Sequence, residues 1–245
     1  MSTSPHSFRN LPSSPNVLDE LLHSLSQPLT GLRCSLELSL DLPLELSPEE
    51  VAEQQQESVA VALQQTEKVI GMIQLMREYL DAEQPAPEAC SAALAQVLRS
   101  VIEELSSIAA VGGIQLRLVG TCTAALPVPE SRLRLALQYL IATMIEAQPV
   151  GGKVTLLLGE GSAGAVLRVE GDRRFREAVT AAPVSTLRRV RLAVAMRVLE
   201  TAGASLEFAD GDSGPAGFVL RIPRPVGAPA GCLDPEILPD GAYRK

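Results

Sequence analysis

The sequence predicts an α+β protein in which an antiparallel pair of long helices precedes an α/β sandwich. Three observations predict this fold: a leucine repeat near the N-terminus, a proline-rich break near residue 85, and short helices and strands after that break. A seven-residue apolar repeat is typical of long helices packed side by side, and helices mixed with short strands are typical of a sandwich. The chain has 245 residues, 46% of them hydrophobic, which suffices for two domains.

The first helix is expected over residues 17–41. Its apolar positions recur at intervals of 4, 3, 4, 3 and 4 residues, which makes a heptad seam of Leu18, Leu22, Leu25, Leu29, Leu32 and Leu36. Pro28 lies within this pattern. An interior proline removes one backbone hydrogen bond and usually kinks the helix.

The second helix is expected to begin after Ser47 and to run to about Asp81. Ser47 is a suitable N-cap, Pro48 suits the first helical position, and Glu50 completes a capping box. A 3, 4 alternation then continues through Val59, Ala62, Thr66, Val69, Ile73, Met76 and Leu80. One hairpin leaves its seam half exposed, so we expect two copies to pair into a dimeric four-helix bundle.

The remaining elements alternate between helices and strands. Helices are expected over 90–110, 131–147 and 187–201, and strands over 114–119, 153–158, 165–170, 205–209 and 217–222, with a turn at Gly151-Gly152. The predicted domains are a disordered leader (1–15), a helical hairpin (16–83), the sandwich (88–223) and an irregular tail (224–245). The residues between 83 and 87 form a linker because two prolines break the helical pattern there.

Composition excludes several classes of function. The net charge of −8, with 3% aromatic residues and no tryptophan, argues against nucleic-acid binding. No apolar run approaches the ~18 residues of a membrane span, so we expect a cytoplasmic protein with no membrane contact. The four cysteines are widely spaced (Cys34, Cys90, Cys122 and Cys232). They predict buried, reduced thiols and neither a disulfide framework nor a metal site.

The segment His23-Ser24-Leu25-Ser26-Gln27-Pro28-Leu29-Thr30 resembles the phosphoacceptor box of bacterial histidine kinases. In that family a histidine is followed five residues later by a Pro-Leu pair. The order of hairpin, linker and sandwich resembles the same kinases over about residues 17–223. The resemblance implies that His23 is a phosphoacceptor, that the hairpin dimerises, and that the sandwich is an ATPase-like domain of the histidine kinase type.

The position of His23 is compatible with that role. It directly follows the seam residue Leu22, so it falls on the flank of the apolar stripe, where an exposed imidazole can receive a phosphoryl group from another protein. The only other histidine, His6, lies in the leader. From spacing alone, His23 can equally be an ordinary surface histidine.

The nucleotide site that the resemblance implies is degenerate. Residues 133–154 resemble the helix and turn that carry the family's two asparagines, but Thr143 stands at the magnesium-binding position and Tyr139 at the other. Gly171 stands where the family has an aspartate that recognises adenine. Asp172 is one position away, and a shifted alignment would place it at the aspartate position. Arg189 and Arg191 occupy positions of the glycine-rich lid, and no glycine occurs from Asp172 to Ala202. We therefore expect no bound cofactor and no metal.

Other residues of the box bear on the reaction. Ser24 replaces the acidic residue that usually follows the histidine, and a serine cannot accept a proton at neutral pH. Gln27 stands where the family can orient a water molecule for dephosphorylation, although its residue type favours an ordinary polar surface residue. Ser24, Ser26, Gln27 and Thr30 are the expected contacts for a partner.

An arginine-rich stretch follows, with eight arginines against three acids between residues 168 and 197. The local charge is 8 − 3 = +5. This stretch either docks an acidic partner or forms a solvated surface.

Three functions remain. The first is a histidine phosphotransferase that carries phosphate between His23 and the receiver aspartates of response regulators without using ATP. The second is a non-catalytic, pseudokinase-like module that binds a response regulator or a kinase, and Ser24 favours this alternative. The third, an active kinase with an unusual ATP site, is the least compatible with Thr143 and the missing lid.

Overall fold

The structure is a computed structural model that describes residues 15–40, 47–84, 90–161, 163–172, 186–209 and 216–223. The predicted leader, apart from its last residue, and the irregular tail lie outside these residues, as do most of the linker and Cys232. The chain forms two compact units. The first comprises residues 1–84 and 183–194, and the second comprises residues 85–182 and 195–245.

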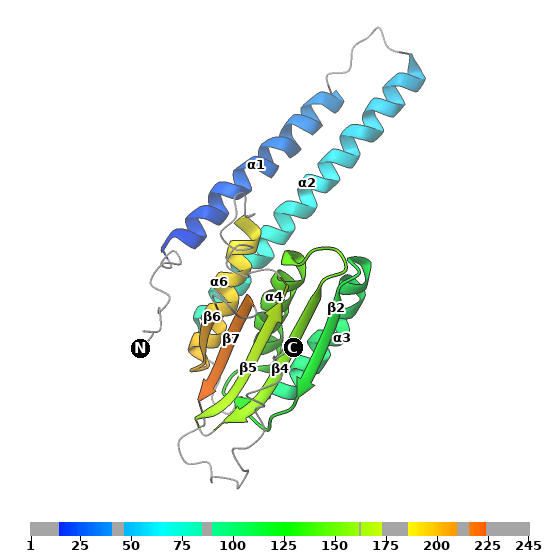
Figure 1. The fold of residues 1–245 in the computed structure, drawn as a ribbon. Coiled ribbons are helices and arrows are strands. Elements are labelled where there is room, and N and C mark those ends of the chain that lie inside the picture. Colours follow the sequence, from blue (N-terminus) through cyan, green and yellow to red (C-terminus); the bar gives the residue numbers. More distant parts are fainter. Residues whose placement is uncertain are drawn as a thin grey trace. The chain divides into compact units, whose positions relative to one another are not determined.

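The first unit contains the predicted helical hairpin, made of α1 (Pro15–Leu40) and α2 (Pro48–Glu83), which lie side by side (Figure 1). The predicted capping box begins α2: the backbone N–H of Glu50 donates to Ser47 Oγ (3.3 Å), and the backbone N–H of Ser47 donates to Glu50 Oε2 (2.9 Å). These bonds pair two donors that a helix start leaves without intrahelical partners. Both helices were therefore predicted correctly, with ends within about two residues.

The packing of the hairpin differs from the predicted seam. On α1 the buried residues are Leu21, Pro28 and Ser35, which recur every seven residues, while Leu22, Leu29 and Leu36 are about half exposed. The remaining seam leucines, Leu18, Leu25 and Leu32, are half-buried. The half-exposed leucines agree with the expectation that one hairpin leaves its seam half exposed, whereas the buried Pro28, Ser35 and Leu21 were not among the predicted seam positions. The leucine repeat merges two neighbouring stripes, and only the partner helix determines which one is covered.

The apolar residues of α2 are likewise divided between two faces. Its buried residues are Ala62, Met72, Leu75, Tyr79 and Ala82. Val59, Ile73 and Leu80, which the sequence placed in the same seam as Ala62, are exposed. Near the middle of the hairpin, a Cβ on Gly31 would lie 3.4 Å from Gln65 Cγ, so residues 31 and 65 lie next to each other across the two helices.

The second unit contains a five-stranded sheet with the strand order β2-β4-β5-β7-β6. Its strands are β2 (Gln115–Gly120), β4 (Lys153–Gly161), β5 (Gly164–Gly171), β6 (Ser205–Ala209) and β7 (Ala216–Pro223). Only the β2–β4 pair is parallel. The helices α3 (Leu94–Val111) and α4 (Glu130–Ala147) cover one face of the sheet (Figure 1). The mixed sheet with helices on one face confirms the predicted sandwich.

Alternating side chains of the central strands form the core of this unit. Val154, Leu156 and Leu158 of β4 are buried, and so are Ala165, Leu167 and Val169 of β5. On α3 the buried positions follow the helical period through Leu94, Val97, Leu98, Val101 and Leu105. These periods are the signals from which the sequence predicted strands and a helix here.

Two elements differ from the prediction. The strands β1 (Ala92–Ala93) and β3 (Ala125–Leu126) form a separate antiparallel pair that the sequence did not predict, because two residues are too few for an alternating pattern.

The last helix described, α6 (Thr186–Thr201), agrees with its prediction. Among the helices described, none is both long enough and apolar enough to cross a membrane.

The described cysteines are all free, but they are not all buried. Cys122 is buried and Cys90 half-buried, whereas Cys34 is exposed on α1. The prediction of buried thiols was therefore wrong for Cys34. This residue precedes the buried Ser35 by one position, and one step along a helix turns a side chain by about 100°.

We expect Cys122 to be alkylated at least about tenfold more slowly than Cys34 at pH 8. Burial raises the pKa of the Cys122 thiol, so less of the reactive thiolate is present at any given pH than for an ordinary cysteine. A time course with iodoacetamide, followed by peptide mass spectrometry, measures both rates. Equal rates at the two positions would contradict the buried placement of Cys122.

Candidate functional site

His23 is exposed on α1, on the side of the helix away from the residues that face α2. Gln27 and Thr30, which follow it by four and seven residues, are also exposed and fall on the same side of the helix. Ser26 is exposed next to them, and Ser24 is half-buried. The predicted partner-binding residues thus share a polar side of α1 with His23, except that Ser24 lies toward the interior of the hairpin.

The two hydroxyl groups on this side are partly engaged by their own helix. Ser26 Oγ donates to the carbonyl of Leu22 (3.4 Å), and Thr30 Oγ1 donates to the carbonyl of Ser26 (2.8 Å). Their oxygens can still accept hydrogen bonds from a partner. Pro28 is buried inside α1 and has no N–H, so the carbonyl of Ser24 lacks the helical hydrogen bond that residue 28 would normally donate. The backbone beside His23 therefore carries a carbonyl without its usual helical partner.

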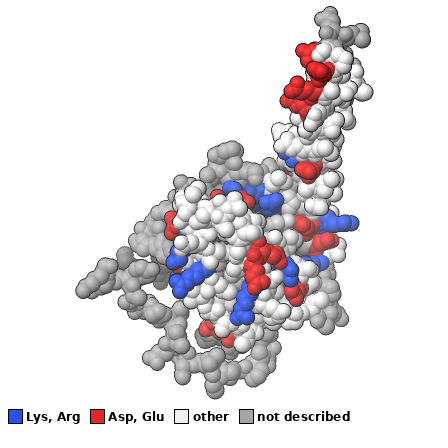
Figure 2. All heavy atoms as spheres, turned by 90° about the vertical axis from the view of Figure 1, so that its right-hand side faces the viewer, with Lys and Arg blue, Asp and Glu red and all other residues white. Residues whose placement is uncertain are grey.

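Charge near His23 is low. Between residues 15 and 32, α1 has only two charged side chains, Asp19 and Glu20, and both are acidic. Figure 2 shows a larger group of acidic side chains at the end of the hairpin where α2 begins, which are Glu49, Glu50, Glu53 and Glu57. In an antiparallel hairpin this end is opposite the one that carries His23. The acidic end and the His23 side are therefore separate surfaces.

Arg189, one of the residues at the lid position, pairs with a residue near His23 on α1. It lies on α6 in the first unit, and its guanidinium donates to Glu20 Oε1 at 2.5 Å. Arg191 is half-buried on the same helix. Both positions are in a regular helix that begins at Thr186, and residues 173–185, the rest of the expected lid, lie outside the described residues.

The described arginines of the arginine-rich stretch are divided between the two units. Among its described members, Arg188, Arg189 and Arg191 belong to the first unit, whereas Arg168 and Arg197 belong to the second. Arg168 pairs with Glu170 at 3.6 Å and Arg197 with Glu200 at 3.7 Å. A local charge of +5 in sequence is therefore divided between two units and reduced by neighbouring carboxylates.

In the second unit, Thr143 is buried within α4, and its Oγ1 donates to the carbonyl of Tyr139 at 2.8 Å. A threonine hydroxyl that is bonded to its own helix in this way has no carbonyl oxygen to offer a cation, unlike the side chain of asparagine. Position 143 thus has a helix-bonded hydroxyl where the resemblance implies a magnesium ligand.

Gly171 lies beside the side chain of Gln148, which the sequence did not single out. A Cβ on Gly171 would lie 2.5 to 2.9 Å from the carboxamide atoms of Gln148. That carboxamide is buried, donates to the carbonyl of Met144 (2.9 Å) and accepts from the backbone N–H of Asp172 (2.7 Å). Gln148 therefore fills the space where the resemblance implies an aspartate side chain.

Asp172, which a shifted alignment would place at the aspartate position, contacts the neighbouring strand. Its carboxylate accepts a hydrogen bond from the backbone N–H of Lys153 at 2.8 Å. The residues Gln148, Lys153 and Asp172 thus link the end of α4 to the start of β4 and the end of β5. Local sequence patterns do not indicate this network, because its two hydrogen bonds to Asp172 join residues that are 19 and 24 positions apart.

We expect Gly171→Ala to destabilise the protein by about 2 kcal/mol, because the new Cβ displaces the Gln148 carboxamide and breaks its two hydrogen bonds. In a Gln148→Ala background the same change should cost under about 1 kcal/mol, since the obstructing atoms are gone. Urea unfolding of the four variants in this double-mutant cycle measures the coupling. Additive costs would show that the two side-chain positions do not compete for the same space.

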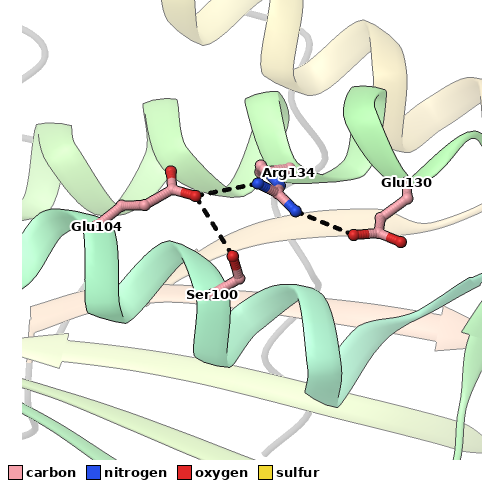
Figure 3. A network of polar contacts seen from close by, with 4 residues as sticks. All are labelled: Ser100, Glu104, Glu130 and Arg134. Atoms are coloured by element: carbon pink, nitrogen blue, oxygen red, sulfur yellow. Dashed lines mark hydrogen bonds and ion pairs between the residues drawn. The ribbon is translucent and has the colours of Figure 1, made fainter.

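A second polar network lies on the surface of the sandwich. Arg134 of α4 bridges Glu130 (3.0 Å) and Glu104 of α3 (3.1 Å), and Ser100 donates to Glu104 (3.3 Å) (Figure 3). Arg134 also lines an open depression with four other residues of α4, which are Glu130, Ser131, Leu135 and Gln138. Exposed ion pairs of this kind contribute about 1 kcal/mol or less, so the network mainly orients α3 against α4.

The structural comparisons identify the fold. The histidine kinase AdeS of Acinetobacter baumannii superposes with a TM-score of 0.58 at 19% identity, over 82% of this chain and 97% of that chain. The histidine kinase ThkA, in complex with the response regulator TrrA, gives a TM-score of 0.57 at 13% identity, over 85% of this chain and 61% of that chain. No protein-family description and no curated protein sequence matches.

The chain has the fold of a histidine kinase core. The hairpin α1–α2 corresponds to the dimerisation and phosphoacceptor domain of such a core, and the second unit to its ATPase-like domain. The likeness spans both units, so it confirms the architecture that the sequence predicted. Within this fold, the notable residues of this chain are Ser24 beside His23, the buried Thr143 and the Gln148 carboxamide beside Gly171.

Proposed function

We propose that this chain is a histidine phosphotransferase of two-component signalling, which exchanges phosphate between His23 and the receiver aspartate of a response regulator. The observation that carries the proposal is the exposure of His23 on a polar side of α1 that it shares with Gln27 and Thr30. Phosphoryl transfer between proteins needs an accessible nucleophile and a surface that the partner can approach. The ThkA structure, of the same fold, holds a response regulator.

The reaction requires little of this chain. One ring nitrogen of His23 attacks the phosphorus, the bond between phosphorus and the aspartate oxygen breaks, and the carboxylate leaves. The proton of the imidazole ring goes to solvent. A receiver domain supplies the acidic residues and the magnesium ion for this step, so the phosphotransferase needs only to present His23. Gln27, one turn further along α1, is placed to orient water toward a bound receiver.

ATP-dependent phosphorylation is not part of the proposal. Thr143 offers no carbonyl ligand to magnesium, Gln148 fills the position beside Gly171, and Ser24 cannot act as the general base. We infer that the ATPase-like unit has a structural or docking role and that phosphate reaches His23 from another protein.

The alternative is a non-catalytic module that binds a response regulator or a kinase without accepting phosphate. Ser24 favours this alternative, because phosphotransferases of this shape usually retain an acidic residue beside the histidine. The two functions make opposite predictions about covalent label on His23 and the same prediction about partner binding. Both place the partner on the side of α1 that carries Ser26, Gln27 and Thr30, with Ser24 at its edge.

We also propose that the hairpin forms a homodimer. The exposed apolar residues of the hairpin include Leu22, Leu29 and Leu36 on α1, and Leu63, Ile70, Ile73 and Leu80 on α2. Each of the α1 residues follows a buried residue by one position (Leu21, Pro28 or Ser35). Each of the α2 residues likewise follows Ala62, Val69, Met72 or Tyr79, of which Val69 is half-buried and the others buried.

One step along a helix turns the side chain by about 100°, always in the same sense. In two antiparallel helices, consider on each helix the residue that follows a residue facing the other helix. Both of these following residues point toward the same side of the hairpin. The two apolar stripes therefore form one surface. A second hairpin that covers it completes a four-helix bundle, which is the occupant that the seven-residue repeat predicts.

The test of the proposed function is to mix the protein with receiver domains that carry labelled aspartyl phosphate, and to follow acid-labile, base-stable phosphate on this chain. The phosphotransferase proposal predicts label on the chain within the lifetime of the receiver phosphate, and loss of an equal amount from the receiver. Binding to a receiver without any transfer of label would overturn the proposal in favour of the non-catalytic module.

A further inference from the structure

The ion pair between Arg189 and Glu20 brings a cation to the phosphoacceptor end of the hairpin. Both residues belong to the first unit, and their charged groups are 2.5 Å apart. The pair is only partly exposed, with 42% of the Arg189 side chain and 30% of the Glu20 side chain accessible. Water therefore screens it less than it screens a fully exposed pair.

Glu20 is also a neighbour of His23 on α1. The two residues are three positions apart, and residues at this spacing are adjacent on a helix surface, about 5–6 Å apart at Cβ. No arginine or lysine occurs on α1 before Arg33, ten residues beyond His23. Arg189 is thus a cation that the fold, and not the helix itself, brings to a carboxylate one turn away from the histidine.

A phosphoryl group on His23 would change the balance of charge at this place. It adds close to two negative charges next to the carboxylate of Glu20. An arginine offers its planar donors to phosphate in pairs and binds a phosphoryl group more strongly than it binds one carboxylate oxygen. The guanidinium of Arg189 needs to move only by about the spacing of one helical turn to reach the new group.

We propose that Arg189 is a phosphoryl-binding residue, which Glu20 holds in place until His23 is phosphorylated and which then exchanges the Glu20 carboxylate for the phosphoryl group. This inference rests on the proposed phosphorylation of His23 and adds the residue that recognises the phosphorylated state. The exchange forms and breaks only hydrogen bonds and an ion pair. It gives the arginine at the former lid position a role that requires no nucleotide.

The direct test loads the full-length protein with phosphoramidate, which requires no partner. The phosphorus–nitrogen bond of the reagent breaks, a bond from phosphorus to the His23 ring forms, and ammonia leaves with the ring proton. The 1H–15N signal of Arg189 Nε, assigned by its absence in Arg189→Gln, is expected to shift on loading. The signal of Arg168, which pairs with Glu170 in the second unit, is the matched control and should not move.

The rate of loading supplies a second readout. Arg189→Gln leaves the Glu20 carboxylate uncompensated and should slow uptake about fivefold, whereas Glu20→Gln should speed it by a similar factor. The double variant restores a neutral site and should load at nearly the wild-type rate, and these differences should shrink in high salt. Arg168→Gln should load like wild type.

The outcomes separate this inference from the proposed function. An Arg189 signal that stays in place on a phosphorylated chain overturns the inference and leaves phosphotransfer intact. A shifted signal on a chain loaded by phosphoramidate, with no transfer from any receiver, supports phosphoryl binding and overturns the phosphotransferase. A chain that takes phosphate from neither source overturns both.

Discussion

His23→Ala is expected to abolish the acid-labile, base-stable label that the wild-type chain acquires from phosphorylated receivers, a loss of at least about 100-fold. The substitution removes the only imidazole in the described part of the chain. Because His23 is exposed, the change should alter the free energy of unfolding by no more than about 0.5 kcal/mol. Quantitative transfer assays and urea unfolding on the same samples measure both effects.

His6→Ala is the matched control, since it removes the only other histidine of the chain and should retain full labelling. Gln27→Ala should still accept label on His23, but more slowly because Gln27 is an expected partner contact, and it should also slow the loss of phosphate from a bound receiver. Label that persists in His23→Ala would place the phosphoacceptor at another residue. That result would contradict the proposal even if the wild-type protein is labelled efficiently.

The second large effect concerns the apolar surface of the hairpin. Leu29→Glu combined with Ile70→Glu is expected to convert a dimer into monomers, with a rise in the dissociation constant of at least about 1000-fold, or about 4 kcal/mol. Each dimer would bury four unpaired carboxylates at its interface, because the two-fold symmetry repeats every substitution. Both side chains are half exposed in the single chain, so the folded monomer should tolerate them.

Leu38→Glu is the matched control within the same helix. Leu38 is 61% exposed, but it follows the exposed Glu37 and lies off the apolar surface. This variant should remain dimeric in sedimentation and light-scattering measurements, and all variants should retain the helical circular dichroism of wild type. A wild-type protein that is monomeric at every accessible concentration would contradict the dimer, and so would a double variant that still dimerises.

Most of the fold could be predicted from local patterns. The capping box at Ser47 and the glycine pair at 151–152 lie at the predicted places, because each depends on residues a few positions apart. The strands around Leu156 and Leu167 show the alternation of a sheet with one buried face. The two-residue strands β1 and β3 were missed because they are too short to show any period.

The candidate site was predictable in its residue types and only partly in its surroundings. The exposure of His23, Gln27 and Thr30 follows from their spacing relative to the leucine repeat. The same repeat could not distinguish Leu22 from Leu21 as the buried residue, because two neighbouring stripes fit one pattern equally well. Ser24 was expected at the docking surface and is half-buried, for the same reason.

The sequence by itself determined the order and type of the elements and the histidine near the start of a heptad-patterned helix, and it led to the expectation of a degenerate nucleotide site. Only the tertiary structure decided that Gln148 fills the space beside Gly171, that Leu21 is buried while Leu22 is half exposed, and that Arg189 pairs with Glu20. The physical reason is the range of the interactions. Periodicity and capping act between residues within about one turn of each other, whereas these contacts join residues from 23 to 169 positions apart and exist only once the chain has folded.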